Sequence, residues 1–300
     1  MAQYGYNGIR VLTITEKGGT PDEKTRKILC LLLCVMLVCV TLAGSLTAMA
    51  VDASVEVQGT GYVDLGNVIQ LTEYSDGVLH LIYYPKWMET SQVQMPILVF
   101  ANGTGCAPVL YISFLMQMAE QGFVVVESSN IMSGDGQDQI ACLDYILTKN
   151  TDPSSVFCGK LDAGRVGTFG HSQGGRGSVN AAINDPRFKA VIYIAGSSYV
   201  WETQNLTTPT LFLSARTDFF VFSPVWVRPN YEVCSAPAVY ANMIGGYHTK
   251  AFLKPSTYNY YCTEWFKAWL NGDQEALNRF RPGGQMSQDP GWEDFASKNF

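Results

Sequence analysis

The chain has 300 residues, of which 47% are hydrophobic and 15% are charged, and its formal net charge is −6 at neutral pH. This length and composition suffice for one large hydrophobic core or two small ones. The chain has no basic stripe, internal repeat or low-complexity tract, which argues against a nucleic-acid partner and against a repeat architecture.

The first 50 residues have the pattern of a secretory signal. A basic cluster at 24–27 precedes an apolar, uncharged stretch at 28–42, and small residues with an Ala-x-Ala site follow up to Ala50. We predict cleavage after Ala50, export, and a single domain over residues 51–300. An uncleaved signal anchor is the alternative, because the apolar stretch and the small residues together nearly suffice to span a bilayer. The anchor would then be the only membrane contact of an extracytoplasmic domain.

Without residues 1–50 the chain keeps 15 basic and 23 acidic side chains, a net charge of −8, and five cysteines. In an exported protein this odd number predicts at most two disulfides and one free thiol. We expect a Cys234–Cys262 bridge and a Cys142–Cys158 bridge, with buried free thiols as the alternative. Neither a Cys-x-x-Cys motif nor a Cys/His cluster occurs in these residues, so we expect no metal. We also expect no cofactor and a monomeric protein.

The periodicity of apolar residues changes along the chain. Residues 71–74 and 78–84 alternate and predict two antiparallel strands around the turn Ser75-Asp76-Gly77. After residue 95, continuous apolar runs typical of strands buried on both faces alternate with helical spacing. We predict strands at 97–101, 123–127, 165–169, 190–195, 210–214 and 239–244, helices at 107–121, 138–148, after 172 and at 258–271, and a tail rich in loops. This order predicts an α/β fold, in which a mostly parallel sheet is flanked by helices on both faces.

One predicted strand ends in Gly170-His171-Ser172-Gln173-Gly174, and small residues that open a helical pattern follow. A serine in a Gly-x-Ser-x-Gly turn between a strand and a helix is typical of a nucleophile elbow. Because this turn is so tight, both flanking positions must lack bulk, which the two glycines satisfy. Ser172 is therefore the predicted nucleophile, at the carboxyl end of the sheet where ligands bind in such folds.

A serine nucleophile needs a base, and the chain has only three histidines. His80 lies in an early predicted strand. His171 precedes Ser172, so its side chain should point away from the serine hydroxyl. His248 follows the last predicted strand in a glycine-rich loop, and we predict that it is the base.

The carboxylate that orients the base should lie between the serine and the histidine in the chain. Asp218 follows the strand at 210–214 by four residues and is the preferred residue. Glu202 is the main alternative. The other two candidates are Glu232 and Asp185, which lies beyond the elbow helix at the opposite edge.

Two backbone N–H groups should bind the oxyanion. One is that of Gln173, directly after the nucleophile. The other should come from the loop 102–105, whose glycines allow the backbone to approach a ligand closely. Thr104 is the preferred donor and Gly103 the alternative.

With these residues the chain resembles bacterial cutinases and polyester hydrolases, a group of dienelactone-hydrolase-related α/β-hydrolases. The resemblance runs from about residue 60 to the end and rests on the loop 102–105, the elbow 170–175, Asp218 and the loop 245–248. It implies an α/β-hydrolase fold. It also implies the same roles for the residues above: Ser172, Asp218 and His248 as a triad, and Thr104 and Gln173 as oxyanion donors.

We therefore predict a secreted serine ester hydrolase that forms an acyl-enzyme with short to medium acyl esters or aliphatic polyesters. Only fourteen residues separate the strands at 190–195 and 210–214, too few for a folded cap, so the site should be open. The residues expected to contact substrate are Gly103, His171, Ser197, Tyr199, Trp201 and Phe219. A polysaccharide deacetylase or a dienelactone-type lactonase is the alternative, followed by a non-catalytic binding protein of the same fold.

Overall fold

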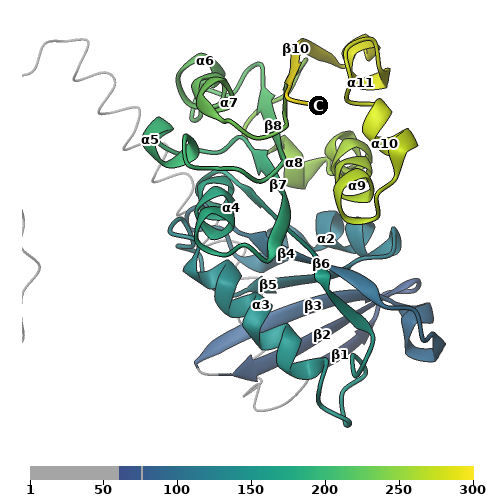
Figure 1. Cartoon of the computed structure of the whole chain (residues 1–300). Coiled ribbons are helices and arrows are strands. Elements are labelled where there is room, and N and C mark those ends of the chain that lie inside the picture. The colour runs from purple at the N-terminus through teal and green to yellow at the C-terminus, as the bar shows by residue number, and fades with distance from the viewer. Residues whose placement is uncertain (1–60, 76) are drawn as a thin grey trace, which may run out of the picture. The chain divides into compact units, whose positions relative to one another are not determined.

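A computed structural model describes residues 61–75 and 77–300, so the predicted leader at 1–50 lies outside the described residues. One sheet runs through them in the order β1-β2-β3-β5-β4-β6-β7-β8-β9-β10 (Figure 1). Its strands are β1 Gly61–Asp64, β2 Val68–Ser75, β3 Val78–Pro85, β4 Met95–Ala101, β5 Val124–Ser128, β6 Leu161–His171, β7 Phe188–Ile194, β8 Thr210–Ala215, β9 Ala238–Met243 and β10 Trp292–Lys298.

Helices cover both faces of this sheet. They are α2 Ile112–Glu120, α3 Gln137–Lys149, α4 Gln173–Asn184, α5 Val200–Thr203, α6 Ser223–Trp226, α7 Arg228–Val233, α8 Lys250–Leu253, α9 Ser256–Leu270, α10 Gln274–Asn278 and α11 Gln285–Gln288, with 3₁₀ turns η1 Lys86–Thr90 and η2 Pro108–Leu110. In Figure 1, α3 and α4 lie on one side of the sheet and α2 and α9 on the other. Within the described residues, no helix combines the length and apolarity needed to cross a membrane.

The six central strands, in the order β5-β4-β6-β7-β8-β9, are all parallel, whereas β1, β2, β3 and β10 join the sheet through antiparallel pairs. Alternate strand residues enter two separate cores. Leu98 and Phe100 pack with α2 and α9, whereas Ile97 and Val99 pack with α3 and α4. Burial on both faces explains the continuous apolar runs in the sequence. The predicted α/β-hydrolase fold is confirmed, and between β7 and β8 only the four-residue α5 intervenes, which is too short for a cap domain.

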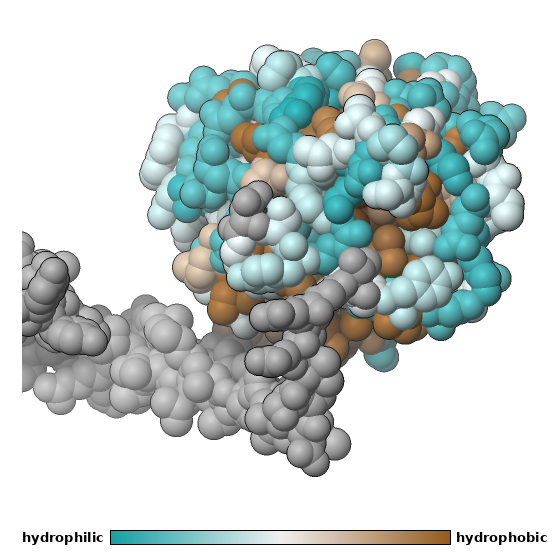
Figure 2. All heavy atoms as spheres, turned by 90° about the horizontal axis from the view of Figure 1, so that it is seen from below, coloured by the Kyte–Doolittle hydropathy of each residue, from teal (hydrophilic) through white to brown (hydrophobic). Residues whose placement is uncertain are grey.

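The edge strand β1 ends in a charged pair. Asp64, the last residue of β1, pairs with Lys86 of η1. Figure 2, which views the molecule of Figure 1 from below, shows hydrophilic side chains over much of that face, with apolar ones between them. Charges at an edge strand disfavour the addition of a further strand from another molecule.

The tail after α9 differs from the predicted loop. It contains α10 and α11, and β10 then pairs antiparallel with β9, placing Trp292 opposite Met243 and Lys298 opposite Ala238. The register shifts between Glu293 and Ala296, so the strand has no unbroken alternation of two residues. Because of this irregularity, the sequence of β10 lacks the period-two pattern that predicts a strand.

The predicted Cys234–Cys262 and Cys142–Cys158 disulfides are wrong, because these four cysteines are free thiols in the structure. Cys234 belongs to the core on the α3 and α4 face, whereas Cys262 belongs to the core on the α2 and α9 face. The sheet lies between these two thiols. Cys142, a residue of α3, is buried, whereas Cys158 is exposed. Two cysteines that flank the same loop in the sequence are not necessarily close in space. A disulfide needs their Cβ atoms to lie within roughly 4 Å of each other.

Candidate active site

Ser172 occupies a sharp turn between β6 and α4. Its backbone has φ 56° and ψ −122°, a conformation that residues other than glycine rarely adopt. A Cβ at Gly170 would lie 2.2 Å from the carbonyl oxygen of Gly174, and a Cβ at Gly174 would lie 2.0 Å from that of Ala101. Both positions therefore require glycine, as predicted from the motif.

His248 lies in the loop between β9 and α8, next to the serine. Its Nε2 atom is 3.0 Å from Oγ of Ser172, and its Nδ1 atom is 2.7 Å from Oδ2 of Asp218. When Nδ1–H donates to the carboxylate, Nε2 is left as the acceptor for the serine hydroxyl. The three side chains have the relative placement of a nucleophile, a base and an orienting carboxylate.

Asp218 is 1% exposed and is held through both oxygens. Its Oδ1 atom accepts hydrogen bonds from the backbone N–H groups of Phe220 at 2.9 Å and Val221 at 2.8 Å, while Oδ2 faces His248. Glu202, the alternative carboxylate, instead accepts a bidentate pair of hydrogen bonds from Arg176. The structure thus brings Asp218, and not Glu202, to the histidine.

The backbone N–H groups of Thr104 and Gln173 donate to no other described residue. Gly103, the alternative donor, is already engaged, because its N–H donates to the hydroxyl of Tyr111 at 3.1 Å. The loop is held in place by the Gly105 N–H, which donates to the carbonyl of Ile131 at 3.0 Å. Thr104 and Gln173 therefore keep free donors, one in the loop after β4 and one at the start of α4.

His171 differs from the expectation that it contacts substrate. It is buried, its Nδ1 atom is 3.0 Å from the Tyr111 hydroxyl, and its Nε2 atom is 2.8 Å from the carbonyl oxygen of His248. Burial and the neighbouring His248 lower the pKa of His171 well below its usual value, so the ring is neutral. Both nitrogens are occupied, and His171 lies behind His248. Tyr111 was not predicted as a site residue, because its only signal in the sequence is its position shortly after the oxyanion loop.

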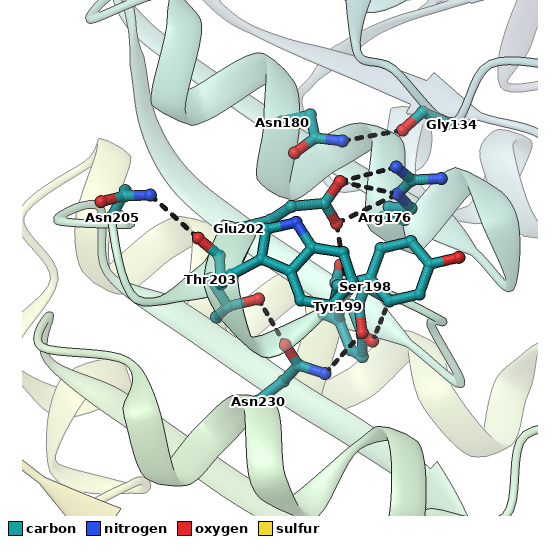
Figure 3. A network of polar contacts seen from close by, with 11 residues as sticks. Gly134, Arg176, Asn180, Ser198, Tyr199, Glu202, Thr203, Asn205 and Asn230 are labelled. Atoms are coloured by element: carbon teal, nitrogen blue, oxygen red, sulfur yellow. Dashed lines mark hydrogen bonds and ion pairs between the residues drawn. The ribbon is translucent and has the colours of Figure 1, made fainter.

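Two of the predicted substrate residues form what we call the aromatic platform, Tyr199 and Trp201. Their ring centroids are 4.1 Å apart and their planes differ by 8°, and the two side chains are 38% and 58% exposed. The Arg176 guanidinium lies 4.9 Å from the centre of the Tyr199 ring and pairs with Glu202 (Figure 3). Glu202 also accepts the Tyr199 backbone N–H at 3.0 Å. The Arg176–Glu202 ion pair therefore holds Tyr199, and with it the platform, in place.

The platform is tied to the nucleophile through the backbone. It begins five residues after Ile194, the last residue of β7, whose carbonyl accepts the Ser172 N–H at 2.9 Å. Arg176 lies one helical turn after Ser172, and its N–H donates to the Ser172 carbonyl at 3.4 Å. Ser197, another predicted substrate residue, is half-buried in the connecting segment.

Exposed aromatic residues also follow Asp218 and form what we call the apolar rim, Phe219, Phe220 and Phe222. They are 89%, 54% and 51% exposed, respectively. The Phe220 ring lies 5.4 Å from the His248 ring, so the rim borders the histidine. No group of three or more His, Cys, Asp or Glu residues in the described part of the chain is placed to hold a metal ion.

Comparison with known proteins gives the family. Residues 47–289 match the family described as PETase, PET hydrolase-like. The chain is 28% identical to cutinase est2 of Thermobifida alba over 174 residues, 56% of this chain and 57% of the relative. It is 29% identical to a bis(hydroxyethyl) terephthalate hydrolase of Streptomyces coelicolor over 199 residues, 64% of this chain and 62% of the relative. It is also 26% identical to cutinase 2 of Thermobifida cellulosilytica over 210 residues, 67% of this chain and 77% of the relative.

The chain thus spans about six tenths of the length of the first two relatives. The family match, in contrast, covers most of the chain, including the elbow, Asp218 and His248. The chain therefore belongs to the PET hydrolase-like family of α/β-hydrolases.

Proposed function

We propose that this chain is a serine carboxylic ester hydrolase with Ser172, His248 and Asp218 as its catalytic triad. The observation that carries the proposal is the unbroken series of contacts from Ser172 Oγ through both ring nitrogens of His248 to the Asp218 carboxylate. The free N–H groups of Thr104 and Gln173 support it as oxyanion donors.

The chemistry follows from these positions. His248 Nε2 takes the hydroxyl proton as Ser172 Oγ attacks the ester carbonyl carbon, and Asp218 stabilises the imidazolium that forms. The negative oxygen of the tetrahedral intermediate is bound by the two N–H groups, each of which would contribute about 3 kcal/mol to lowering the barrier. The C–O bond to the alcohol then breaks, and His248 returns its proton to the alcohol. Water repeats the cycle on the acyl-enzyme and releases the acid.

The substrates we propose are short to medium acyl esters or aliphatic polyesters. The aromatic platform follows β7 and the apolar rim follows Asp218 after β8, so both expose apolar surface beyond the carboxyl ends of the two strands that come after β6 in the sheet, which suits an apolar acyl chain. The names of the relatives, two cutinases and a bis(hydroxyethyl) terephthalate hydrolase, support esters as the substrate class.

We further propose that residues 1–50 are a secretory signal and that residues 51–300 form the catalytic domain. The basic cluster at 24–27, the apolar stretch after it and the Ala-x-Ala site support this proposal. Amino-terminal sequencing of the exported protein should begin at Val51. Intact chain in the membrane fraction would instead establish the signal anchor.

The activity is tested with p-nitrophenyl esters of increasing acyl length and with a fluorophosphonate that labels activated serines. Hydrolysis together with labelling of Ser172, both absent in Ser172→Ala, would support the proposal. Folded protein that neither hydrolyses the esters nor takes the label would identify a non-catalytic binding protein instead.

A further inference from the structure

Three parts of the proposed site come from distant positions in the chain: the loop 102–105, the elbow and the loop of His248. Two buried side chains lie where these parts meet. Tyr111 is 1% exposed and His171 is 2% exposed, and their polar atoms contact both loops. Neither residue has a part in the mechanism described above.

The direction of each hydrogen bond follows from chemistry. The carbonyl oxygen of His248 can only accept, so Nε2 of His171 must carry the proton and donate at 2.8 Å. The buried ring is neutral, so its Nδ1 atom has no proton and accepts from the Tyr111 hydroxyl at 3.0 Å. The hydroxyl oxygen in turn accepts the N–H of Gly103 at 3.1 Å. One continuous series of three bonds thus joins the Gly103 backbone to the His248 backbone.

We propose that Tyr111 and His171 are positioning residues, which hold the Thr104 oxyanion donor and the His248 base at the spacing that the reaction requires. This inference rests on the proposed function of the triad. Gly103 directly precedes the donor, and the carbonyl that His171 binds belongs to the base itself. Loss of either bond frees one loop to shift relative to the other.

The surroundings hold the two rings closely, and the Cys106 thiol is a further neighbour of the Tyr111 hydroxyl. A Cβ at Gly103 would lie 3.0 Å from both the Tyr111 hydroxyl and His171 Nδ1. The ring of Phe252 packs on both side chains, with centroids 5.1 Å from Tyr111 and 5.4 Å from His171. Packing places the rings, and the hydrogen bonds fix their orientation.

The neutral state of His171 also matters for catalysis. Its ring centroid is 4.6 Å from that of His248, so a positive charge on His171 would oppose the imidazolium that must form there. By donating to Nδ1, the Tyr111 hydroxyl stabilises the neutral tautomer that has its proton on Nε2.

The first test is Tyr111→Phe, which keeps the ring and removes the hydroxyl. We expect kcat for p-nitrophenyl butyrate to fall about 10- to 100-fold, the effect of a small misplacement of catalytic groups, with KM little changed. Tyr83→Phe is the matched control. Tyr83 is also fully buried on the same face of the sheet and donates to Glu127 at 3.1 Å, outside this series. The control should lose stability but keep its kcat.

The second test uses His171. In His171→Gln the side-chain amide can still donate to the His248 carbonyl and accept from Tyr111, whereas His171→Phe can do neither. Glutamine should therefore retain most of the kcat that phenylalanine loses. The double variant Tyr111→Phe/His171→Phe should be no slower than His171→Phe alone, because both changes break the same series.

The third test does not depend on activity. Long-range ¹H–¹⁵N spectra of the wild-type protein should show His171 protonated at Nε2 only, with an Nδ1 signal that moves in Tyr111→Phe. A proton on Nδ1, or a Tyr111→Phe variant with full kcat while Ser172→Ala is inactive, would overturn the positioning role. An active Ser172→Ala variant would instead overturn the proposed function, while the tautomer result would still stand. If Tyr111→Phe fails to fold, the tautomer and the His171→Gln comparison decide.

Discussion

Nε2 of His248 lies 3.0 Å from Oγ of Ser172, although the two residues are 76 positions apart in the chain. The sheet explains this closeness. Ser172 follows β6, Asp218 follows β8 and His248 follows β9, and these strands are parallel members of one sheet. Three loops from the same edge therefore converge, which is where ligands bind in such folds.

This convergence leads to the first prediction. Ser172→Ala and His248→Ala should each lower kcat by about 10⁴- to 10⁶-fold, and the double variant should be no worse than either single one. Asp218→Asn should lower it by about 10⁴-fold, because the histidine loses its correct tautomer. Asp185→Asn is the matched control, since that carboxylate binds Arg187 and should leave kcat unchanged. An Asp218→Asn variant with near-normal kcat would remove Asp218 from the triad.

The aromatic platform gives the second prediction. Trp201→Ala should raise KM for a medium-chain ester about fivefold, the equivalent of roughly 1 kcal/mol of lost aromatic contact, with kcat nearly constant. The effect on p-nitrophenyl acetate should be small, because an acetyl group lacks the longer chain that the platform is proposed to bind. Trp87→Ala, which removes another tryptophan that is 49% exposed, is the control. Equal changes in both variants would show that Trp201 does not bind the acyl chain.

The third prediction concerns access to the site. The segment between β7 and β8 holds only the short α5, and Ser172 is half-buried rather than enclosed. The rate should therefore rise smoothly as the concentration of a medium-chain triglyceride passes its solubility limit. A sharp rise at that limit would show a lid that opens at an interface and would contradict the open site.

The fourth prediction concerns stability and pH. Glu127 is fully buried, and burial raises the pKa of its carboxyl group well above the usual value. In the unfolded chain this group ionises above about pH 4.5, whereas in the folded protein it keeps its proton to a higher pH. The unfolded state therefore binds fewer protons above pH 4.5, and the free energy of unfolding falls as pH rises, by up to about 1.4 kcal/mol per pH unit.

Glu127→Gln removes this titration and keeps a neutral side chain of similar shape. Urea unfolding at pH 5, 6 and 7 should show the variant gaining stability over the wild-type protein with each step in pH. The hydrogen bond from Tyr83 to the side-chain oxygen can persist in the variant, so the comparison isolates the titration. Two stability curves that stay parallel across this range would show that Glu127 is ionised in the folded state.

The sequence by itself determined those features that depend on neighbouring residues. The elbow was predictable because its tight turn excludes side chains at Gly170 and Gly174, and that exclusion is local. The parallel strands were predictable because burial on both faces leaves continuous apolar runs. The role of His248 as the base was predictable because the chain has only three histidines, and only His248 comes after Ser172 in the sequence and directly follows a predicted strand.

Only the tertiary structure decided which residues meet across the sheet. Asp218 contacts His248 while Glu202 turns to Arg176, and Gly103 donates to Tyr111 and leaves Thr104 free. Free thiols at Cys234 and Cys262 depend in the same way on which face of the sheet each one joins. Strand order and register set these distances, and both arise from packing the whole core. A sequence pattern shows which side of a strand is apolar, but not which neighbour will cover it.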